Sequence, residues 1–198
     1  MSLRSSPRVL VTGFGPFGGE AINPSGVIAE RLGGLCLPVA AEEAWEQTRA
    51  VMRRSGASIV LALGVAGGRS RVCVEKRAVN EAAYPLADDA GRVLAGPLRE
   101  RSAPAVRETA FSAADIARAI RRRSVPAWVS RDAGRYVCNH FYYLLLERLE
   151  GRAVFLHIPR LPETVAPLGG GPSLCLEDSM RAAAAALRFL ERQATLPS

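Results

Sequence analysis

Ser58-Ile59-Val60-Leu61-Ala62-Leu63 is apolar almost from end to end, and Gly64 follows it directly. A short apolar run that ends at a glycine predicts a strand buried on both faces, which is typical of a parallel sheet covered by helices. Comparable runs predict four more strands, over Arg8–Thr12, Leu35–Ala40, Pro126–Ser130 and Ala153–His157. A strand-like alternation also surrounds Glu75, in Val72–Asn80.

Helical patterns lie between most of these strands. They cover Gly26–Leu32, Glu42–Arg54, Ala113–Arg123, Asn139–Leu149 and the segment from about Ser173 to Arg192, whereas Glu81–Thr109 reads mostly as loop. Strands that alternate with helices predict an α/β protein. We therefore expect a three-layer α/β/α sandwich with a mainly parallel, twisted central sheet. Residues 1–198 are expected to form a single domain, with residues 1–7 as a flexible N-terminus.

The composition is that of an ordinary soluble globular protein, with 48% hydrophobic and 23% charged residues. The formal net charge is +7, and Lys76 is the only lysine among 26 basic residues. We attribute this excess of arginine to genome composition, because the basic runs are not interleaved with the aromatic residues that a single-strand binding surface uses. The run Arg121-Arg122-Arg123 is interpreted as a solvated helix end, with a phosphate-binding patch as the alternative. No nucleic-acid partner is expected.

Four cysteines lie far apart in the chain, at Cys36, Cys73, Cys138 and Cys175. Because no C-x-x-C pair occurs and only two histidines are present, we expect no metal site and no cofactor. Four unpaired thiols are normal in a reducing compartment, which predicts a cytoplasmic protein. No apolar run is long enough to span a bilayer and no signal peptide is recognisable, so no membrane association is expected.

The most informative cysteine is Cys138, within the segment Ala133-Gly134-Arg135-Tyr136-Val137-Cys138-Asn139-His140. An extended stretch led by glycine runs into this cysteine, and Phe141–Leu149 then reads as a helix. We expect Cys138 at or near a helix N-terminus, where unpaired backbone N–H groups and the helix dipole favour the thiolate. A cysteine in this position is a candidate nucleophile.

The segment Gly13-Phe14-Gly15-Pro16-Phe17-Gly18 matches the dinucleotide-binding pattern G-x-G-x-x-G and follows a predicted strand. A dinucleotide site also needs a helix that opens at once, so that its N-terminus meets the pyrophosphate. Here Pro16 and the glycines continue the loop until about Pro24, so we reject a nucleotide site. Phe14 and Phe17 instead suggest an apolar ligand pocket at the end of a strand, with simple core packing as the alternative.

A thiolate nucleophile needs a base, and the chain offers two histidines. His140 lies two positions after Cys138, and residues with this spacing do not face each other on a helix. His157 ends a predicted strand, and catalytic groups of open α/β sheets gather at the carboxyl ends of the strands. His157 is therefore the better candidate, with a purely structural histidine as the alternative.

An acid should hold the second ring nitrogen of such a histidine, and Glu75 is the candidate. It lies in the otherwise apolar and basic stretch Val72–Val79. The alternative is an ordinary ion pair between Glu75 and Arg71 or Arg77, and the residues alone leave both interpretations open.

Five blocks of sequence resemble those of a known family, in the same order. They are Val11-Thr12-Gly13-Phe14 through Pro16-Phe17-Gly18-Gly19 with Asn23-Pro24-Ser25; Leu63-Gly64 with Ala66-Gly67-Gly68-Arg69; Glu75 with Ala78 and Asn80; Ala133-Gly134 with Tyr136-Val137-Cys138-Asn139-His140; and His157-Ile158-Pro159 with Leu161-Pro162-Glu163. From Arg8 to about Leu190 the chain thus resembles pyroglutamyl peptidase I, or pyrrolidone-carboxylate peptidase, a cysteine peptidase family.

This resemblance implies an exopeptidase that removes N-terminal pyroglutamate (5-oxoproline) from peptides through a thioester acyl-enzyme. The family's catalytic glutamate, cysteine and histidine fall on Glu75, Cys138 and His157, which favours the orienting role for Glu75. The family's pyroglutamyl-ring pocket falls on Phe14, Phe17, Tyr136 and Val137. Because family members often associate, the resemblance also implies a homo-oligomer, a dimer or a tetramer.

Three positions depart from the family pattern. Gly15 stands where the family has an acid, and Val65 stands where it has a glutamine near the ring site. The family's arginine, which by resemblance helps to stabilise the oxyanion, aligns with Pro85, and loss of one such donor typically costs about 10²–10³ in kcat. Arg135 and Arg77 are the candidates to replace it. The departures keep two alternatives open: a related thiol amidohydrolase with altered acyl specificity, and a catalytically weak member that acts as a binding protein.

Overall fold

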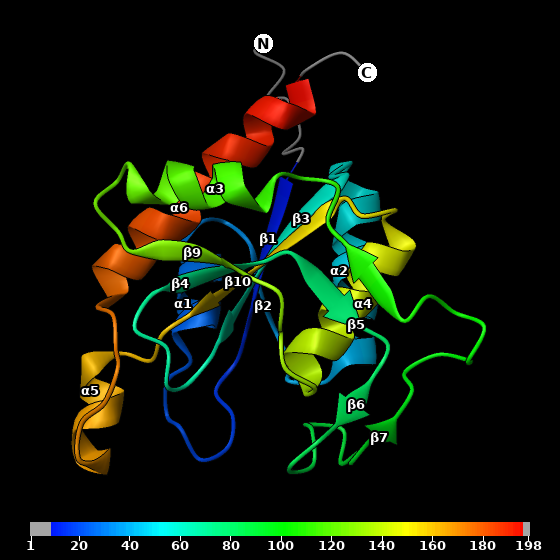
Figure 1. Ribbon diagram of the computed structural model, residues 1–198, viewed down its shortest axis with the longest axis horizontal. Coiled ribbons are helices and arrows are strands. Elements are labelled where there is room, and N and C mark those ends of the chain that lie inside the picture. Colours follow the sequence, from blue (N-terminus) through cyan, green and yellow to red (C-terminus); the bar gives the residue numbers. More distant parts are fainter. Residues whose placement is uncertain (1–8, 196–198) are drawn as a thin grey trace.

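A twisted sheet of six strands forms the middle layer of the molecule (Figure 1). The computed structural model describes residues 9–195, so the predicted flexible N-terminus at residues 1–7 lies outside the described residues. The strand order is β2-β1-β3-β10-β4-β9, and only β10 and β4 pair antiparallel. The strands are β1 (Val9–Phe14), β2 (Leu35–Leu37), β3 (Ile59–Val65), β4 (Val72–Glu75), β9 (Ala127–Ser130) and β10 (Ala153–Ile158). The predicted mainly parallel sheet is therefore confirmed.

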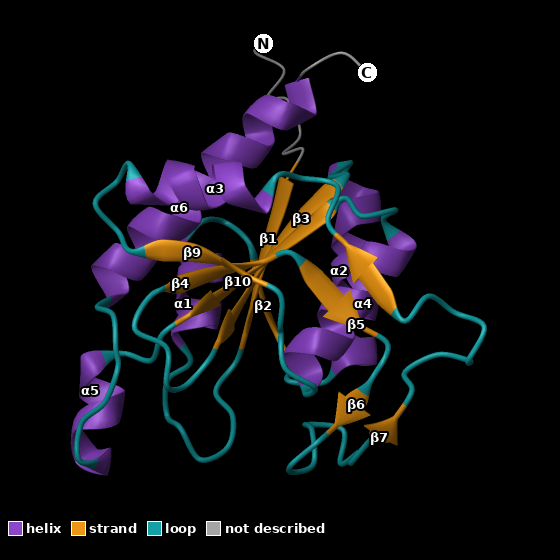
Figure 2. Ribbon diagram, viewed as in Figure 1, coloured by secondary structure: helices purple, strands orange, loops and turns teal. Residues whose placement is uncertain are grey.

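Helices cover both faces of this sheet, and Figure 2 shows the strands fanned between them. One face packs against α1 (Pro24–Arg31), α3 (Ala113–Arg121) and α6 (Leu176–Thr195), and the other against α2 (Ala41–Ser55) and α4 (Val137–Arg148). The short elements α5 (Pro162–Val165) and η1 (Ala166–Leu168) follow β10. Two small antiparallel pairs complete the fold: β5 (Arg77–Val79) with β8 (Val106–Glu108), and β6 (Ala82–Ala83) with β7 (Ala95–Gly96).

The apolar strands divide their side chains between two hydrophobic cores, because successive residues of a strand point to opposite faces. In β3, Leu61 and Leu63 belong to the core under α1, α3 and α6, whereas Val60 and Ala62 belong to the core under α2 and α4. All four side chains are fully buried. Burial on both faces explains why the sequence of this strand is apolar without alternation.

Two strands continue through glycines that the sequence pattern suggested as their ends. A Cβ atom on Gly13 would lie 2.0 Å from the carbonyl oxygen of Ser25, and one on Gly64 would lie 2.9 Å from Sγ of Cys138. These glycines therefore let α1 and the start of α4 approach the sheet closely, and the strands run on to Phe14 and Val65.

The segment Val72–Asn80 is two strands rather than one, because the backbone leaves the central sheet at Lys76 and enters the β5–β8 pair. Helix α4 starts at Val137, two residues before the predicted start, so Cys138 lies within its first turn. Both differences shape the site, since β4 ends at Glu75 and α4 begins beside Cys138.

Candidate active site

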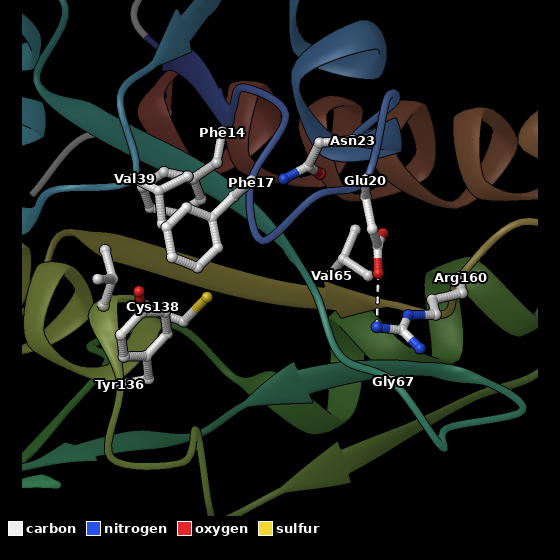
Figure 3. Close-up of a pocket in the computed structure, with 11 residues that line it drawn as sticks. Phe14, Phe17, Glu20, Asn23, Val39, Val65, Gly67, Tyr136, Cys138 and Arg160 are labelled. Atoms are coloured by element: carbon white, nitrogen blue, oxygen red, sulfur yellow. Dashed lines mark ion pairs between the residues drawn. The ribbon is translucent and has the colours of Figure 1, made fainter. Parts of the chain in front are cut away.

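A pocket of about 170 Å³ lies at the carboxyl edge of the sheet, between the loops after β1 and β3, the start of α4 and the segment after β10 (Figure 3). It is smaller than the roughly 300–1,000 Å³ of sites for drug-sized ligands, so it suits one small ring or side chain. Its lining residues are Phe14, Phe17, Glu20, Asn23, Val39, Val65, Gly67, Tyr136, Val137, Cys138 and Arg160.

Aromatic side chains form one wall of the pocket. Phe17 and Tyr136 lie with their ring centroids 5.6 Å apart, and Tyr84 supports Tyr136 from behind in an edge contact at 4.7 Å. Phe14 is buried and packs edge-on against Phe141 of α4. Phe14, Phe17, Tyr136 and Val137, the four ring-site residues named from the sequence, all line this one pocket with Cys138.

Cys138 is half-buried in the first turn of α4, and Figure 3 shows its sulfur pointing into the pocket. Tyr136 caps this helix without a side-chain hydrogen bond, so the backbone N–H groups of the first turn have no capping side chain. The sulfur rests against the backbone of Gly64, because only a glycine leaves room for it there. The thiol is thus held between a helix start and the end of β3.

His157 and Glu75 form a buried hydrogen-bonded pair on neighbouring strands. The distance between His157 Nδ1 and Glu75 Oε1 is 2.8 Å, and the Glu75 side chain is fully buried. His157 is also the direct neighbour of Gly64 across the β10–β3 pair. Since the sulfur of Cys138 lies on Gly64, the structure brings the thiol, the imidazole and the carboxylate to the same part of the sheet.

Glu75 has a second partner, Arg69, whose role the sequence did not reveal. Arg69 Nη1 lies 2.7 Å from the same Oε1 atom, and Nη2 donates to the backbone oxygen of Asp132 at 2.9 Å. The suggested partners of Glu75 were wrong: Arg71 lies over the ring of Trp128, and Arg77 donates to a backbone carbonyl. The only sequence signal for Arg69 was its place in the Gly68-Arg69 block.

The resting state of Cys138 also differs from the expectation of a thiolate at a helix start. Burial raises the pKa of the Cys138 thiol to about 12, and the nearby Glu75 carboxylate adds to this, whereas Arg69 and the backbone N–H of Cys138 act in the opposite direction. The effect of desolvation on this pKa is larger than the opposite effect of the helix start. Cys138 is therefore a thiol at neutral pH until a base accepts its proton.

His140 lies away from the pocket, as the helix spacing predicted. Its Nδ1 atom pairs with the hydroxyl of Tyr84 at 2.8 Å, and the ring is buried. Burial lowers the pKa of His140 to about 4, so the ring is neutral at physiological pH. Its contacts are those of a structural histidine that fixes α4 against the Tyr84 loop.

Neither arginine suggested as a replacement for Pro85 lines the pocket. Arg135 pairs with Glu81 and Asp132 outside it. The cation that does line the pocket is Arg160, which forms an ion pair with Glu20 at 2.5 Å. Both residues were missed, although each follows the carboxyl end of a strand, where ligand-binding residues of α/β sheets gather. Asn23 and Gly67 also line the pocket; both belong to the sequence blocks of the family resemblance, but neither was predicted as a site residue, and Val39 had no sequence signal.

Within residues 9–195, no cluster of histidine, cysteine, aspartate and glutamate side chains is arranged to hold a metal ion. Over the same residues, every helix is too short or too polar to cross a membrane.

Comparison with known proteins decides the family. The family model for pyroglutamyl peptidase matches residues 7–193. The chain belongs to the pyroglutamyl peptidase family. A pyrrolidone-carboxylate peptidase of Yersinia pestis (strain Pestoides F) is 36% identical over 182 residues, covering 84% of this chain and 85% of that protein.

Solved structures of this family agree with the fold. The crystal structure of Bacillus amyloliquefaciens pyroglutamyl peptidase I superposes with a TM-score of 0.87 at 30% identity, over 94% of this chain and 97% of the other. The pyrrolidone carboxyl peptidase of Fervidobacterium islandicum AW-1 gives a TM-score of 0.85 at 33% identity, over 93% and 98% of the two chains. The resemblance inferred from the five sequence blocks is confirmed, as is the α/β fold.

Proposed function

We propose that this member of the pyroglutamyl peptidase family is an active cysteine exopeptidase, in which Cys138 is the nucleophile, His157 the general base and acid, and Glu75 the residue that orients His157. The observation that carries the proposal is the 2.8 Å contact between His157 and a fully buried Glu75, next to the strand position on which the sulfur of Cys138 rests. This is the arrangement of nucleophile, base and orienting acid that acyl transfer requires.

In the first half of the reaction, His157 accepts the thiol proton of Cys138 as the sulfur attacks the carbonyl carbon of the pyroglutamyl residue. Because the pKa of the resting thiol is raised, proton transfer accompanies attack. The uncapped N–H groups at the start of α4, including that of Cys138, donate to the oxygen that becomes negative. Glu75 stabilises the imidazolium that forms.

In the second half, the tetrahedral intermediate collapses and the bond from the carbonyl carbon to the leaving nitrogen breaks. His157 gives its proton to that nitrogen, so the shortened peptide leaves as a neutral amine and a thioester remains on Cys138. Water then attacks the thioester, with His157 accepting a proton from it. Pyroglutamate is released, and the proton returns to the sulfur.

The pocket suits an uncharged lactam. Phe17 and Tyr136 offer apolar surface for the methylene groups of the ring, and Arg160, the one cation among the described lining residues, is neutralised by Glu20. A charged N-terminal residue would have to enter a small, largely aromatic site, at the cost of its hydration. A pyroglutamyl residue has no free α-amine and avoids this cost. No cofactor takes part in these steps.

Incubation with a pyroglutamyl-coumarin amide tests the proposed function, with the Cys138→Ala variant as the blank. Turnover well above that blank is expected. A panel of other acyl-coumarins tests the amidohydrolase alternative, which would be favoured if another acyl group were cleaved and pyroglutamyl were not. Absence of any turnover would favour the binding-protein alternative.

The Arg69→Gln substitution is expected to move the acid limb of the kcat/KM profile to higher pH. Arg69, which is paired with Glu75, lowers the pKa of the Cys138 thiol. Removing this cation makes the thiol form of Cys138 more stable, so a higher pH is needed to reach the reactive thiolate. The pH profile on a pyroglutamyl-coumarin amide measures the shift. An acid limb at the same or a lower pH would contradict this prediction.

We further propose that the protein works in the reducing environment of the cytoplasm and as a homo-oligomer. The four cysteines are all free thiols, which is the state that a reducing compartment maintains. The homo-oligomer rests on the resemblance to the family alone, and light scattering of the purified protein measures it directly.

A further inference from the structure

The pocket contains an ion pair that the proposed steps do not use. Arg160 and Glu20 lie 2.5 Å apart, and both side chains are about one-third exposed, at 34% and 29%. Figure 3 shows this pair across the pocket from Phe17 and Tyr136, with the sulfur of Cys138 pointing into the space between the two sides. A bound substrate that reaches across the nucleophile must therefore meet the pair.

Two contacts hold the guanidinium of Arg160, and a third holds its backbone. Glu20 binds Nη2, the plane of the group lies over Gly67, where a Cβ atom would be 3.5 Å from Cζ, and Arg160 O accepts a hydrogen bond from the N–H of Leu174 at 3.0 Å. A preorganised guanidinium loses little freedom when it forms a further hydrogen bond. Arg160 is thus built into the wall rather than free in solvent.

The hydrogen-bonding capacity of Arg160 is far from satisfied. Its buried Nε atom has no hydrogen-bond partner among the described residues, and its ion pair with Glu20 is made by Nη2. A guanidinium carries five N–H donors, and native structures rarely leave buried donors unpaired without a functional reason. The side chain is also 34% exposed, so an N–H group on the open side of the guanidinium can donate to an acceptor brought by the substrate while Nη2 keeps its contact with Glu20.

The position of His157 indicates which part of the substrate meets this wall. As general acid, His157 must lie beside the leaving nitrogen, so the leaving peptide extends on its side of the pocket. Arg160 follows His157 by three residues, and this segment pairs with the end of β3: Ile158 is the neighbour of Val65, and the N–H of Ala66 donates to Ile158 O at 3.0 Å. With the ring against the aromatic side, a leaving peptide that runs toward the carboxyl end of β10 comes next to Arg160.

We propose that Arg160 is a specificity-determining residue for the leaving peptide, and that its guanidinium donates to the backbone carbonyl oxygen of the first residue after the scissile bond. This inference rests on the proposed function. Glu20 neutralises the guanidinium, so the wall favours a neutral carbonyl over a carboxylate. The preferred substrates are then pyroglutamyl peptides and peptide amides rather than pyroglutamyl derivatives of simple aromatic amines.

Two substrates with the same acyl group and different leaving groups test the proposal. Pyroglutamyl-alanine amide has the carbonyl that Arg160 would bind, and pyroglutamyl β-naphthylamide has none. The Arg160→Met substitution keeps the length of the side chain and removes the donors. We expect kcat/KM for the alanine amide to fall about 10- to 100-fold, the range for loss of a hydrogen bond to a charged group. The value for the naphthylamide should change less than about threefold.

The comparison separates this inference from the proposed function. If both activities fell to the same extent, Arg160 would act on the pyroglutamyl ring or on folding, and the inference would be overturned. It would also be overturned if neither activity fell. If the unmodified protein cleaves neither substrate, the proposed function itself fails. The matched control is Arg181→Met, which removes an exposed arginine paired with Asp178 on α6 and should leave both activities unchanged.

A second variant tests the part assigned to Glu20. Glu20→Gln leaves the guanidinium with an uncompensated charge, so free pyroglutamyl-alanine, which carries a carboxylate, should gain relative to its amide. An unchanged ratio of the two kcat/KM values would contradict the role proposed for Glu20, which is to neutralise the charge of Arg160.

Discussion

Replacement of Cys138 with serine is expected to lower kcat on a pyroglutamyl substrate by about 10⁴- to 10⁶-fold, the size of effect seen when a nucleophile is removed from a triad. A serine hydroxyl fits the space against Gly64, but it is much less acidic than a thiol. Burial already raises the pKa of the thiol to about 12, and His157 would have to remove a far less acidic proton. The serine and alanine variants should therefore be equally inactive.

The other cysteines provide the control for this experiment. Cys175 is an exposed free thiol outside the pocket, so Cys175→Ser should retain full activity. Iodoacetamide labelling followed by mass spectrometry should show that loss of activity follows alkylation of Cys138 alone. If the Cys138→Ser variant kept more than a hundredth of the activity, another residue would have to be the nucleophile.

The fold was predictable because its signals are local. The apolar run before Gly64 predicted a strand covered on both faces, and β3 is one. The start of α3 is likewise set by a local contact, in which the Ser112 hydroxyl accepts from the N–H of Asp115 at 3.2 Å. Element ends were less predictable because they depend on partners. From the sequence, Gly13 looks like the end of a strand. In the structure, a glycine is needed there because the carbonyl group of Ser25 in α1 leaves no room for a Cβ atom.

In the candidate site, too, some residues have local sequence signals and others do not. Cys138 and His157 were found from their places at a helix start and a strand end. Glu75 needed the family resemblance, because an acid in a basic stretch has several neighbours in sequence and its actual partner, Arg69, is six residues away. The pair of Arg160 and Glu20 joins segments 140 residues apart in the chain, as their numbers show, and no local pattern could bring them together. The raised pKa of Cys138 could not be predicted from the sequence either, because desolvation depends on how the folded site is packed.

Replacement of Glu75 with glutamine is the second change for which we expect a large effect. An amide has nearly the shape of the carboxylate, so Arg69 keeps an acceptor. It cannot, however, stabilise the imidazolium of His157, and its N–H₂ group favours the wrong tautomer of the ring. We expect kcat to fall about 10³- to 10⁴-fold, as when the acid of a triad becomes an amide. Stability should fall by about 1–3 kcal/mol, the contribution of hydrogen bonds to a charged group.

A matched variant separates the catalytic loss from the structural one. Glu147 forms ion pairs with three arginines, Arg99, Arg107 and Arg148, but it lies near the end of α4 opposite to Cys138 and does not line the pocket. Glu147→Gln should therefore lower the midpoint of thermal unfolding and leave kcat/KM unchanged. In the double variant Arg69→Met/Glu75→Gln, part of the lost stability should return because no partly buried cation is left without a charged partner, but the activity should not. If Glu75→Gln kept kcat within tenfold of the unmodified protein, Glu75 would be a structural partner of Arg69, and His157 would need no acid to orient it.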